Sequence, residues 1–293
     1  MASAYGFLYY MQYDGIVAYD WDTGEVAWHY SAGDSGFETP YGTWPFFTDA
    51  TIADGKIYSA NGEHSPTTPL PRGWKLHCIN ATTGEGIWNI TGGGSPAAVA
   101  DGYLTFDNRY DGYMYVFGKG KSATTVTASP KVSVHGSKVL IEGTILDQSP
   151  AQPGTPCVSK DSMAGWLQYL HMQRPIPEKV TGVPVLLDTL DPNGNYVHIG
   201  DVTTDGYSGT FGYTWEPEVP GQYQVTATFM GDDSYGSSFA TTYVTVSEAP
   251  PVTAAPEQTQ IPDYTPMMYA ILAVGIIAII MSAIAILLIL RKR

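Results

Sequence analysis

Two asparagines stand in the pattern that accepts N-linked glycans. They are Asn80, followed by Ala-Thr, and Asn89, followed by Ile-Thr. Attachment of a sugar to either amide is expected only where the chain lies outside the cytoplasm. A second interpretation applies to Asn80, which aligns with Asp20 ahead of a Thr-Gly turn and could hydrogen-bond the backbone of that turn. Both asparagines are candidate glycosylation sites, and both interpretations of Asn80 stay open.

Other polar residues do not form a catalytic or metal-binding pattern. The six histidines are scattered without the spacing of metal ligands. The segments Asp191–Asn195 and Gly231–Ser234 resemble calcium loops, but neither has the full ligand series with a terminal glutamate, which favours turns. The sequence also has no nucleophile elbow or phosphate loop. We therefore expect no catalytic residue, no metal site and no cofactor.

Aromatic residues are concentrated near the N-terminus. If exposed, they could bind sugars or peptides by stacking; if buried, they would fill the space between sheets, which we favour. The set comprises Tyr9, Tyr10, Tyr13, Tyr19, Trp21, Tyr41, Trp44, Phe46 and Phe47. The two cysteines are too few for a disulfide framework, and Cys78 is expected to be a buried free thiol.

The strands that must position these residues recur along the chain. Asp14–Trp28 has alternating apolar residues on either side of an Asp-Thr-Gly turn, the pattern of two short paired strands. The pattern returns in Gly73–Trp88. Gly24 and Gly84 are separated by the same number of residues as Trp28 and Trp88, so the two segments align without a gap over these positions.

A second similarity marks where the repeating units begin. Ile52–Tyr58 resembles Val99–Thr105, and each carries an Ala-Asp-Gly turn before a strand. Four short strands in roughly 40 to 47 residues are typical of a β-propeller blade. We expect about three blades, the second with an inserted loop at Asn61–Gly73. The first ends near Tyr30, the second spans about Thr48–Ile90 and the third about Ala97–Gly118.

These motifs, Ala-Asp-Gly-x-(Ile/Leu)-(Tyr/Thr) and Asp-x-x-Thr-Gly-x-x-x-Trp, resemble the repeat of the pyrroloquinoline-quinone-like β-propeller family over about residues 1–120. The resemblance implies that Trp28 and Trp88 dock between neighbouring blades. The third unit departs from the pattern, because it has no Thr-Gly…Trp. Family members that bind the quinone use calcium-ligating carboxylates and, in many, adjacent cysteines. No Cys-Cys pair exists here, so we expect no quinone cofactor and no enzyme activity.

The number of blades raises a question of completeness. Propellers close with about four to eight blades, and about three are expected here. Either N-terminal blades are missing from this sequence, or copies of the chain associate to complete a ring. The N-terminus also does not resemble a secretory signal, although the rest of the chain points to export. We favour a truncated product or a fragment of a larger ectodomain.

Residues 121–247 predict an immunoglobulin-like, antiparallel β-sandwich of seven or eight short strands. The segment Pro220–Tyr235 looks like the penultimate strand of immunoglobulin-like domains in prokaryotic surface proteins, with Tyr223 as the corner tyrosine. An insertion at about 147–181 contains a predicted helix, Ser159–Met172, capped by Ser159. We expect this helix to cover a sheet edge or end; the alternative is a partner site.

The C-terminal region predicts a membrane anchor. Residues 248–266 form a Pro/Thr-rich stalk, and Met267–Leu290 has no charged residue. At about 1.5 Å per residue this helix exceeds a hydrocarbon core of about 30 Å. Arg291, Lys292 and Arg293 should stay in the cytoplasm, with the N-terminal ectodomain outside.

The charge balance excludes one class of partner. The chain has 28 acidic and 14 basic residues, and three of the basic ones are the last three. Nucleic-acid binding requires clustered cations, so we expect no such partner. The favoured hypothesis is a non-enzymatic, membrane-anchored surface protein of archaeal or bacterial type, whose propeller recognises an extracellular protein or carbohydrate or acts as a scaffold. The alternative is the C-terminal part of an exported quinone-dependent dehydrogenase whose catalytic blades lie upstream.

Overall fold

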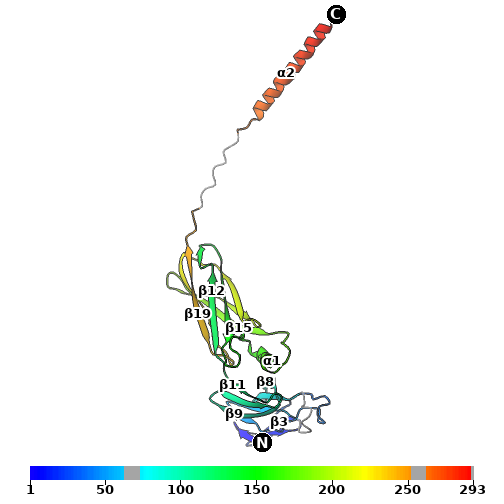
Figure 1. Ribbon diagram of the computed structural model, residues 1–293, viewed down its shortest axis with the longest axis vertical. Helices are drawn as coiled ribbons and strands as arrows, with labels where there is room; N and C mark the ends of the chain where they lie inside the picture. Colours follow the sequence, from blue (N-terminus) through cyan, green and yellow to red (C-terminus); the bar gives the residue numbers. More distant parts are fainter. Residues whose placement is uncertain (63–72, 252–261, 292–293) are drawn as a thin grey trace. The chain divides into compact units, whose positions relative to one another are not determined.

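The computed structural model describes residues 1–62, 73–251 and 262–291 (Figure 1). The chain divides into two units, Met1–Ala249 and Pro250–Arg293, which are described separately. Strands dominate the first unit, and the second contains an apolar helix near the C-terminus. The predicted fold class, mostly β with a C-terminal apolar helix, is confirmed. Most of the predicted inserted loop and stalk lies outside the described residues.

The first two blades are four-stranded antiparallel meanders with the same register. Blade 1 consists of β1 (Ala2–Ala4), β2 (Phe7–Gln12), β3 (Gly15–Asp20) and β4 (Val26–Tyr30). Blade 2 consists of β5 (Thr51–Ala53), β6 (Lys56–Ala60), β7 (Lys75–Asn80) and β8 (Gly86–Thr91). In blade 1 Leu8 pairs with Tyr19, and in blade 2 Ile57 pairs with Ile79. The offset seen in the sequence is therefore a structural repeat.

Blade 3 has three strands, one fewer than blades 1 and 2, and it is the unit whose sequence departs from the repeat. They are β9 (Gly94–Ala100), β10 (Tyr103–Asn108) and β11 (Tyr113–Phe117). No Thr-Gly turn follows β11, so the chain does not fold back to form an outer strand. Instead the chain leaves the blade at Gly120, whose N–H donates to the Ser234 carbonyl at 2.8 Å.

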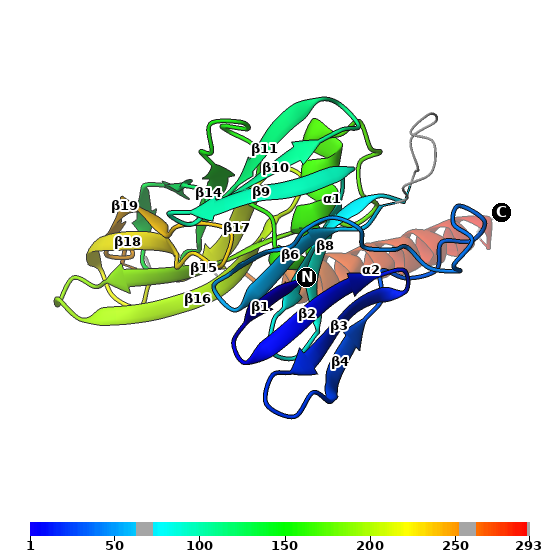
Figure 2. The same cartoon turned by 90° about the horizontal axis from the view of Figure 1, so that it is seen from below.

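Apolar side chains hold the three blades together. One buried cluster, which includes Ile16, Phe46 and Ile79, lies between blades 1 and 2. A second, which includes Leu76 and Phe106, lies between blades 2 and 3. Figure 2 shows the three sheets of blades β1–β4, β5–β8 and β9–β11 beside one another.

The rest of the first unit is a two-sheet sandwich. One sheet contains β12 (Ser122–Ser129), β14 (Val139–Asp147) and β17 (Thr210–Trp215). The other has the order β13 (Val132–Val134), β19 (Ser238–Ser247), β18 (Gly221–Phe229), β15 (Thr181–Leu190) and β16 (Tyr196–Asp205). The predicted all-antiparallel arrangement is wrong at one place, because β13 pairs with β19 in parallel. The short β13 follows β12 after Pro130 and joins the opposite sheet, where it runs in the same direction as β19.

Tyr223 forms the predicted corner. The residue is 2 % exposed, and its hydroxyl donates to the Val219 carbonyl at 2.8 Å and accepts from the Val219 N–H at 2.9 Å. The ring also meets Trp215 edge to face at 5.0 Å. Packing and these two hydrogen bonds fix the turn into β18. Cys78 and Cys157 form no disulfide.

Tyr223→Phe should therefore lower the free energy of unfolding by about 1 to 2 kcal/mol, because it removes both hydrogen bonds and keeps the ring. Urea unfolding of the chain in detergent micelles measures the change. Tyr243→Phe is the matched control, since Tyr243 lies on the neighbouring strand β19 and is 54 % exposed. An equal loss in both variants would contradict the corner assignment.

Helix α1 (Lys160–His171) lies between β14 and β15, within the predicted insertion. Ser159 occupies the N-cap position, but its hydroxyl bonds to Ser162 Oγ instead of the helix backbone. Met163 packs against the sandwich core, whereas Leu167 and Met172 pack against the cluster of blades 2 and 3. Figures 1 and 2 show α1 beside β8 and β11. The helix therefore joins sandwich and blades, the covering role we favoured.

Helix α2 (Thr265–Leu290) belongs to the second unit. It is long enough and apolar enough to cross a membrane, and none of its side chains is buried by protein. Within the apolar stretch the Ser282 hydroxyl donates to the Ala278 carbonyl at 2.8 Å. That bond satisfies the Ser282 donor inside the helix, where lipid would offer it no acceptor.

Candidate functional site: the open face of blade 1

Blade 1 has one face against blade 2 and an opposite face that carries exposed apolar side chains. The register sets Leu8, Tyr19 and Val26 in one row and Tyr10 beside Val17 in the next. Together with Trp21 they form what we call the blade 1 open face. Its exposed fractions reach 42 % at Tyr10, 59 % at Val26 and 63 % at Trp21. Large apolar residues gathered on one exposed face are typical of an interaction surface.

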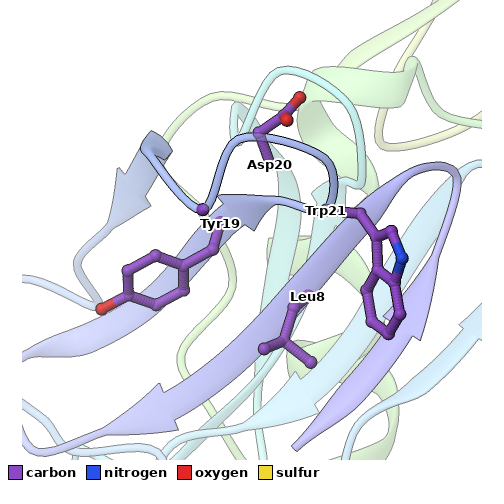
Figure 3. Close-up of a pocket in the computed structure, with 5 residues that line it drawn as sticks. Leu8, Tyr19, Asp20 and Trp21 are labelled. Atoms are coloured by element: carbon purple, nitrogen blue, oxygen red, sulfur yellow. The ribbon is translucent and has the colours of Figure 1, made fainter.

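A shallow cavity of about 430 Å³ opens on this face. Its lining is Leu8, Tyr19, Asp20, Trp21 and Gly24. Figure 3 shows the rings of Tyr19 and Trp21 on either side of Leu8. The cavity therefore offers an apolar floor with two flanking aromatic rings, a shape and chemistry that suit a flat apolar group.

Asp20 is the charged residue that lines the cavity, and hydrogen bonds within its own turn fix the position of its carboxylate. Its Oδ1 accepts hydrogen bonds from the backbone N–H of Asp22 and of Thr23, and from the Thr23 hydroxyl. The bonds from Thr23 and Asp22 keep the pKa of the Asp20 carboxyl below its usual value. An ionised carboxylate used in this way supports the turn and is poorly suited to general acid catalysis at neutral pH.

The structure places Trp28 and Trp88 between blades. Trp28 packs against the cluster of blades 1 and 2, with its ring centroid 5.7 Å from that of Tyr9. Trp88 packs against the cluster of blades 2 and 3, and its ring lies 6.0 Å from that of Phe117. Gly24 and Gly84 occupy the matching turns with φ of +73° and +75°. Glycine adopts this left-handed conformation without the steric cost other residues incur.

The two sequons differ in their surroundings. The Asn80 side-chain oxygen accepts from the backbone N–H of Thr82 at 2.9 Å and of Thr83 at 3.0 Å, as Asp20 does in blade 1. These bonds give Asn80 a structural role in its turn. Asn89, on β8, has an exposed side chain. The more accessible candidate for glycosylation is therefore Asn89.

The N-terminal aromatic residues divide between the two expected roles. Tyr9, Trp44 and Phe46 are buried, with 0 %, 7 % and 1 % of their surface exposed. The exposed members are Tyr10, Tyr13, Trp21, Tyr41 and Phe47. Within this second set, the Tyr13 ring contacts those of Tyr41 and Phe47 at 4.6 and 5.1 Å. The expectation of burial thus holds for only part of the set.

The two loops that resemble calcium sites use their aspartates for turn hydrogen bonds. Asp191 accepts from the N–H groups of Asn193 and Asn195 between the paired strands β15 and β16. Asp232 accepts in the same way from Ser234 and Tyr235. Across residues 1–62, 73–251 and 262–291, no three His, Cys, Asp or Glu side chains are grouped as metal ligands would be.

Both cysteines are free and fully buried. Burial raises the pKa of the Cys78 thiol to about 12 and also raises the pKa of the Cys157 thiol. A thiol reagent such as Ellman's reagent should therefore react with the native chain at least about 100-fold more slowly than with the urea-unfolded chain, because thiolate is the reactive form. Rapid labelling of either cysteine without urea would contradict this burial.

Comparisons with known proteins do not assign the chain to a family. No family model and no curated protein matches it. Similar solved structures include the fibronectin(III)-like modules of Clostridium thermocellum CbhA, at 14 % identity over 67 % of this chain and 88 % of that one. The sporulation control protein Spo0M from Bacillus subtilis matches at 11 % identity over 45 % and 51 %. BamB from Moraxella catarrhalis matches at 14 % over 74 % and 57 %.

Each of these three superpositions has a TM-score of 0.26, which is too low to support an argument about fold or function. The chain spans about half the length of the Spo0M and BamB chains that it matches. Strand order and register define the blades and the sandwich. The resemblance to quinone-type repeats remains a prediction.

Proposed function

We propose that this chain is a membrane-anchored surface protein whose blades act as a non-enzymatic recognition or scaffolding module. The observation that carries the proposal is the blade 1 open face, which presents aromatic and aliphatic side chains to solvent on a chain that also has an apolar helix of membrane-spanning length. A protein or carbohydrate ligand outside the cell would bind such a surface by apolar contact and ring stacking.

Membrane anchoring and orientation are tested by fractionation of the cells that make the chain. The full chain should stay in the membrane after carbonate extraction, and a chain ending at residue 264 should be released. Protease added to intact cells should remove an N-terminal tag and spare a C-terminal one, because Arg291 and the two basic residues after it favour the cytoplasm. Extraction of the full chain, or loss of the C-terminal tag, would contradict the proposal.

Recognition is tested with purified envelopes of the same cells as the binding surface. The chain with Tyr10→Ser and Trp21→Ser should bind at least about 10-fold more weakly, since both side chains are exposed on the open face. The matched control carries Phe239→Ser and Tyr243→Ser, exposed on β19 of the sandwich. Equal binding by both variants and the unchanged chain would argue against the open face.

The non-enzymatic part of the proposal has a separate test. Pyrroloquinoline quinone added with Ca²⁺ should keep its absorbance spectrum in the presence of the chain. A spectral shift that saturates at one quinone per chain would instead support a quinone-binding protein.

A further inference from the structure

We propose that the cavity on the blade 1 open face is a seat for a tryptophan carried by the outer strand of a further blade of the same repeat, supplied by a polypeptide segment other than the three blades described. This inference rests on the proposed function and deepens it, because it names a polypeptide blade of the same repeat as the partner of the open face; it does not depend on the membrane anchor. It rests on the structural repeat, because blade 2 has an equivalent seat that is occupied.

The occupied seat shows what fits. Trp28 comes from β4, the outer strand of blade 1, and lies over the turn of blade 2 at Gly84. A Cβ added to Gly84 would come within 2.6 Å of the Trp28 ring. The same ring packs against the cluster that contains Ile57, Ile79 and Ala81. The seat in blade 2 therefore has a floor of small or aliphatic side chains and a glycine at its rim.

The cavity in blade 1 is built from the equivalent positions. Leu8 faces Tyr19 across the strands as Ile57 faces Ile79. The Trp21 N–H donates to the Gly6 carbonyl at 2.9 Å, and the Ala81 N–H donates to the Gly55 carbonyl at 2.9 Å. The lining residues Leu8, Tyr19, Trp21 and Gly24 thus correspond to Ile57, Ile79, Ala81 and Gly84.

The two seats differ in occupancy. A Cβ added to Gly24 would meet no atom within 4 Å, whereas one at Gly84 would meet Trp28. Because the register and the glycine φ are shared, we expect the Gly24 seat to take the group found at Gly84, an indole from a neighbouring outer strand. The rings of Tyr19 and Trp21 would contact that indole where blade 2 has Ile79 and Ala81. An indole bound there would cover Leu8 and Trp21, and removing their apolar surface from water would stabilise the folded chain.

A second folded copy of this chain has no such tryptophan to offer. Trp28 and Trp88 already pack between blades, and Trp215 packs against the sandwich core. The other buried tryptophans are Trp44, Trp74 and Trp166, which are 7 %, 4 % and 4 % exposed. The seventh, Trp21, belongs to the seat itself. The occupant is therefore a blade with its own outer-strand tryptophan.

The test adds such a blade in the spacing that the chain already uses. Blade 1 begins at Ala2 and blade 2 begins at Thr51. A full chain in which residues 1–49 are repeated ahead of Met1 preserves that spacing and brings the added copy's Trp28 to the Gly24 seat. In detergent micelles its thermal midpoint should exceed that of the unchanged chain by at least about 3 °C.

Three variants identify the contact. Gly24→Asn in the receiving blade should abolish the gain, because asparagine tolerates positive φ and its side chain would fill the seat. Trp28→Ala in the added copy should do the same and leaves the receiving blade unaltered. Gly136→Asn, in a sandwich turn with φ of +84° and open space around it, should keep the gain.

Either of two results would overturn the proposal. One is an extended chain whose thermal midpoint does not rise, or whose rise persists both with Gly24→Asn in the receiving blade and with Trp28→Ala in the added copy. The other is sedimentation of the unextended chain as a dimer that Gly24→Asn dissociates, which would assign the seat to a second copy.

Discussion

Trp28→Ala should lower the free energy of unfolding of the chain by about 3 kcal/mol, the lower end of the range for removal of a large aromatic side chain from a core. Trp28 contacts both blades: its ring lies 5.7 Å from that of Tyr9 and covers the turn at Gly84. The loss stays at the lower end because the side chain is only partly buried. Urea unfolding followed by tryptophan fluorescence measures it.

Trp21→Ala is the matched control within the same blade. Trp21 is 63 % exposed and lines the empty seat, so its removal should change the free energy of unfolding by no more than about 0.5 kcal/mol. Similar losses for the two variants would show that Trp28 does not join the blades in solution.

The contact with Gly84 can be isolated by a double-mutant cycle. Gly84→Ala in the unchanged chain adds a Cβ that collides with the Trp28 ring, and in the Trp28→Ala chain that collision is absent. The two substitutions should therefore couple by at least about 1 kcal/mol. Gly24→Ala has nearly the same φ and open space, so it should not couple to Trp28→Ala.

The repeat explains why the blades could be predicted from the sequence. Gly24 and Gly84 are required by left-handed turns, and Trp28 and Trp88 by the gaps between blades, so each leaves a mark at a fixed spacing. The strands of the sandwich could also be predicted, from their alternating apolar residues. The parallel pairing of β13 with β19 could not be predicted, because such a short strand has too few side chains to specify its partner.

The cavity on the blade 1 open face was missed for a similar reason. Tyr19 belongs to the aromatic set for which we favour burial between sheets, and Leu8 carries no motif; the structure pairs the two on the face of blade 1 opposite the buried Tyr9. A signal was available in the alignment of Tyr19 with Ile79, which follows the offset that relates Gly24 to Gly84. The burial of His77 beside Tyr30 could not be predicted, because it depends on two blades coming together.

Acidification should destabilise the chain through His77. This side chain is 2 % exposed, lies between Tyr30 and Phe46, and has its Nδ1 3.0 Å from the Tyr30 hydroxyl. Burial, with a smaller contribution from the charge of Lys75, lowers the pKa of His77 from 6.5 to about 3. Its Nε2 is buried without a hydrogen-bond partner, so a proton added to the ring would have no acceptor to stabilise it.

The sign follows from the lowered pKa. Below pH 6.5 the unfolded chain binds a proton at His77 that the folded chain does not bind until about pH 3, so stability falls as the pH falls through that interval. The loss is about 1.4 kcal/mol for each pH unit, or about 3 kcal/mol at pH 4.5 relative to pH 7.5. Urea unfolding at the two pH values measures this difference, and His77→Gln should remove most of it.

His198 supplies the control with the opposite sign. A hydrogen bond to Asp188 at 2.8 Å, helped by the charge of Asp201, raises the pKa of His198. The stability it contributes is complete at low pH and is lost as the pH rises through its raised pKa. His198→Gln should therefore leave the acid loss intact or enlarge it. If His77→Gln and His198→Gln changed the pH dependence equally, protonation of a histidine buried between blades 1 and 2 could not be its cause.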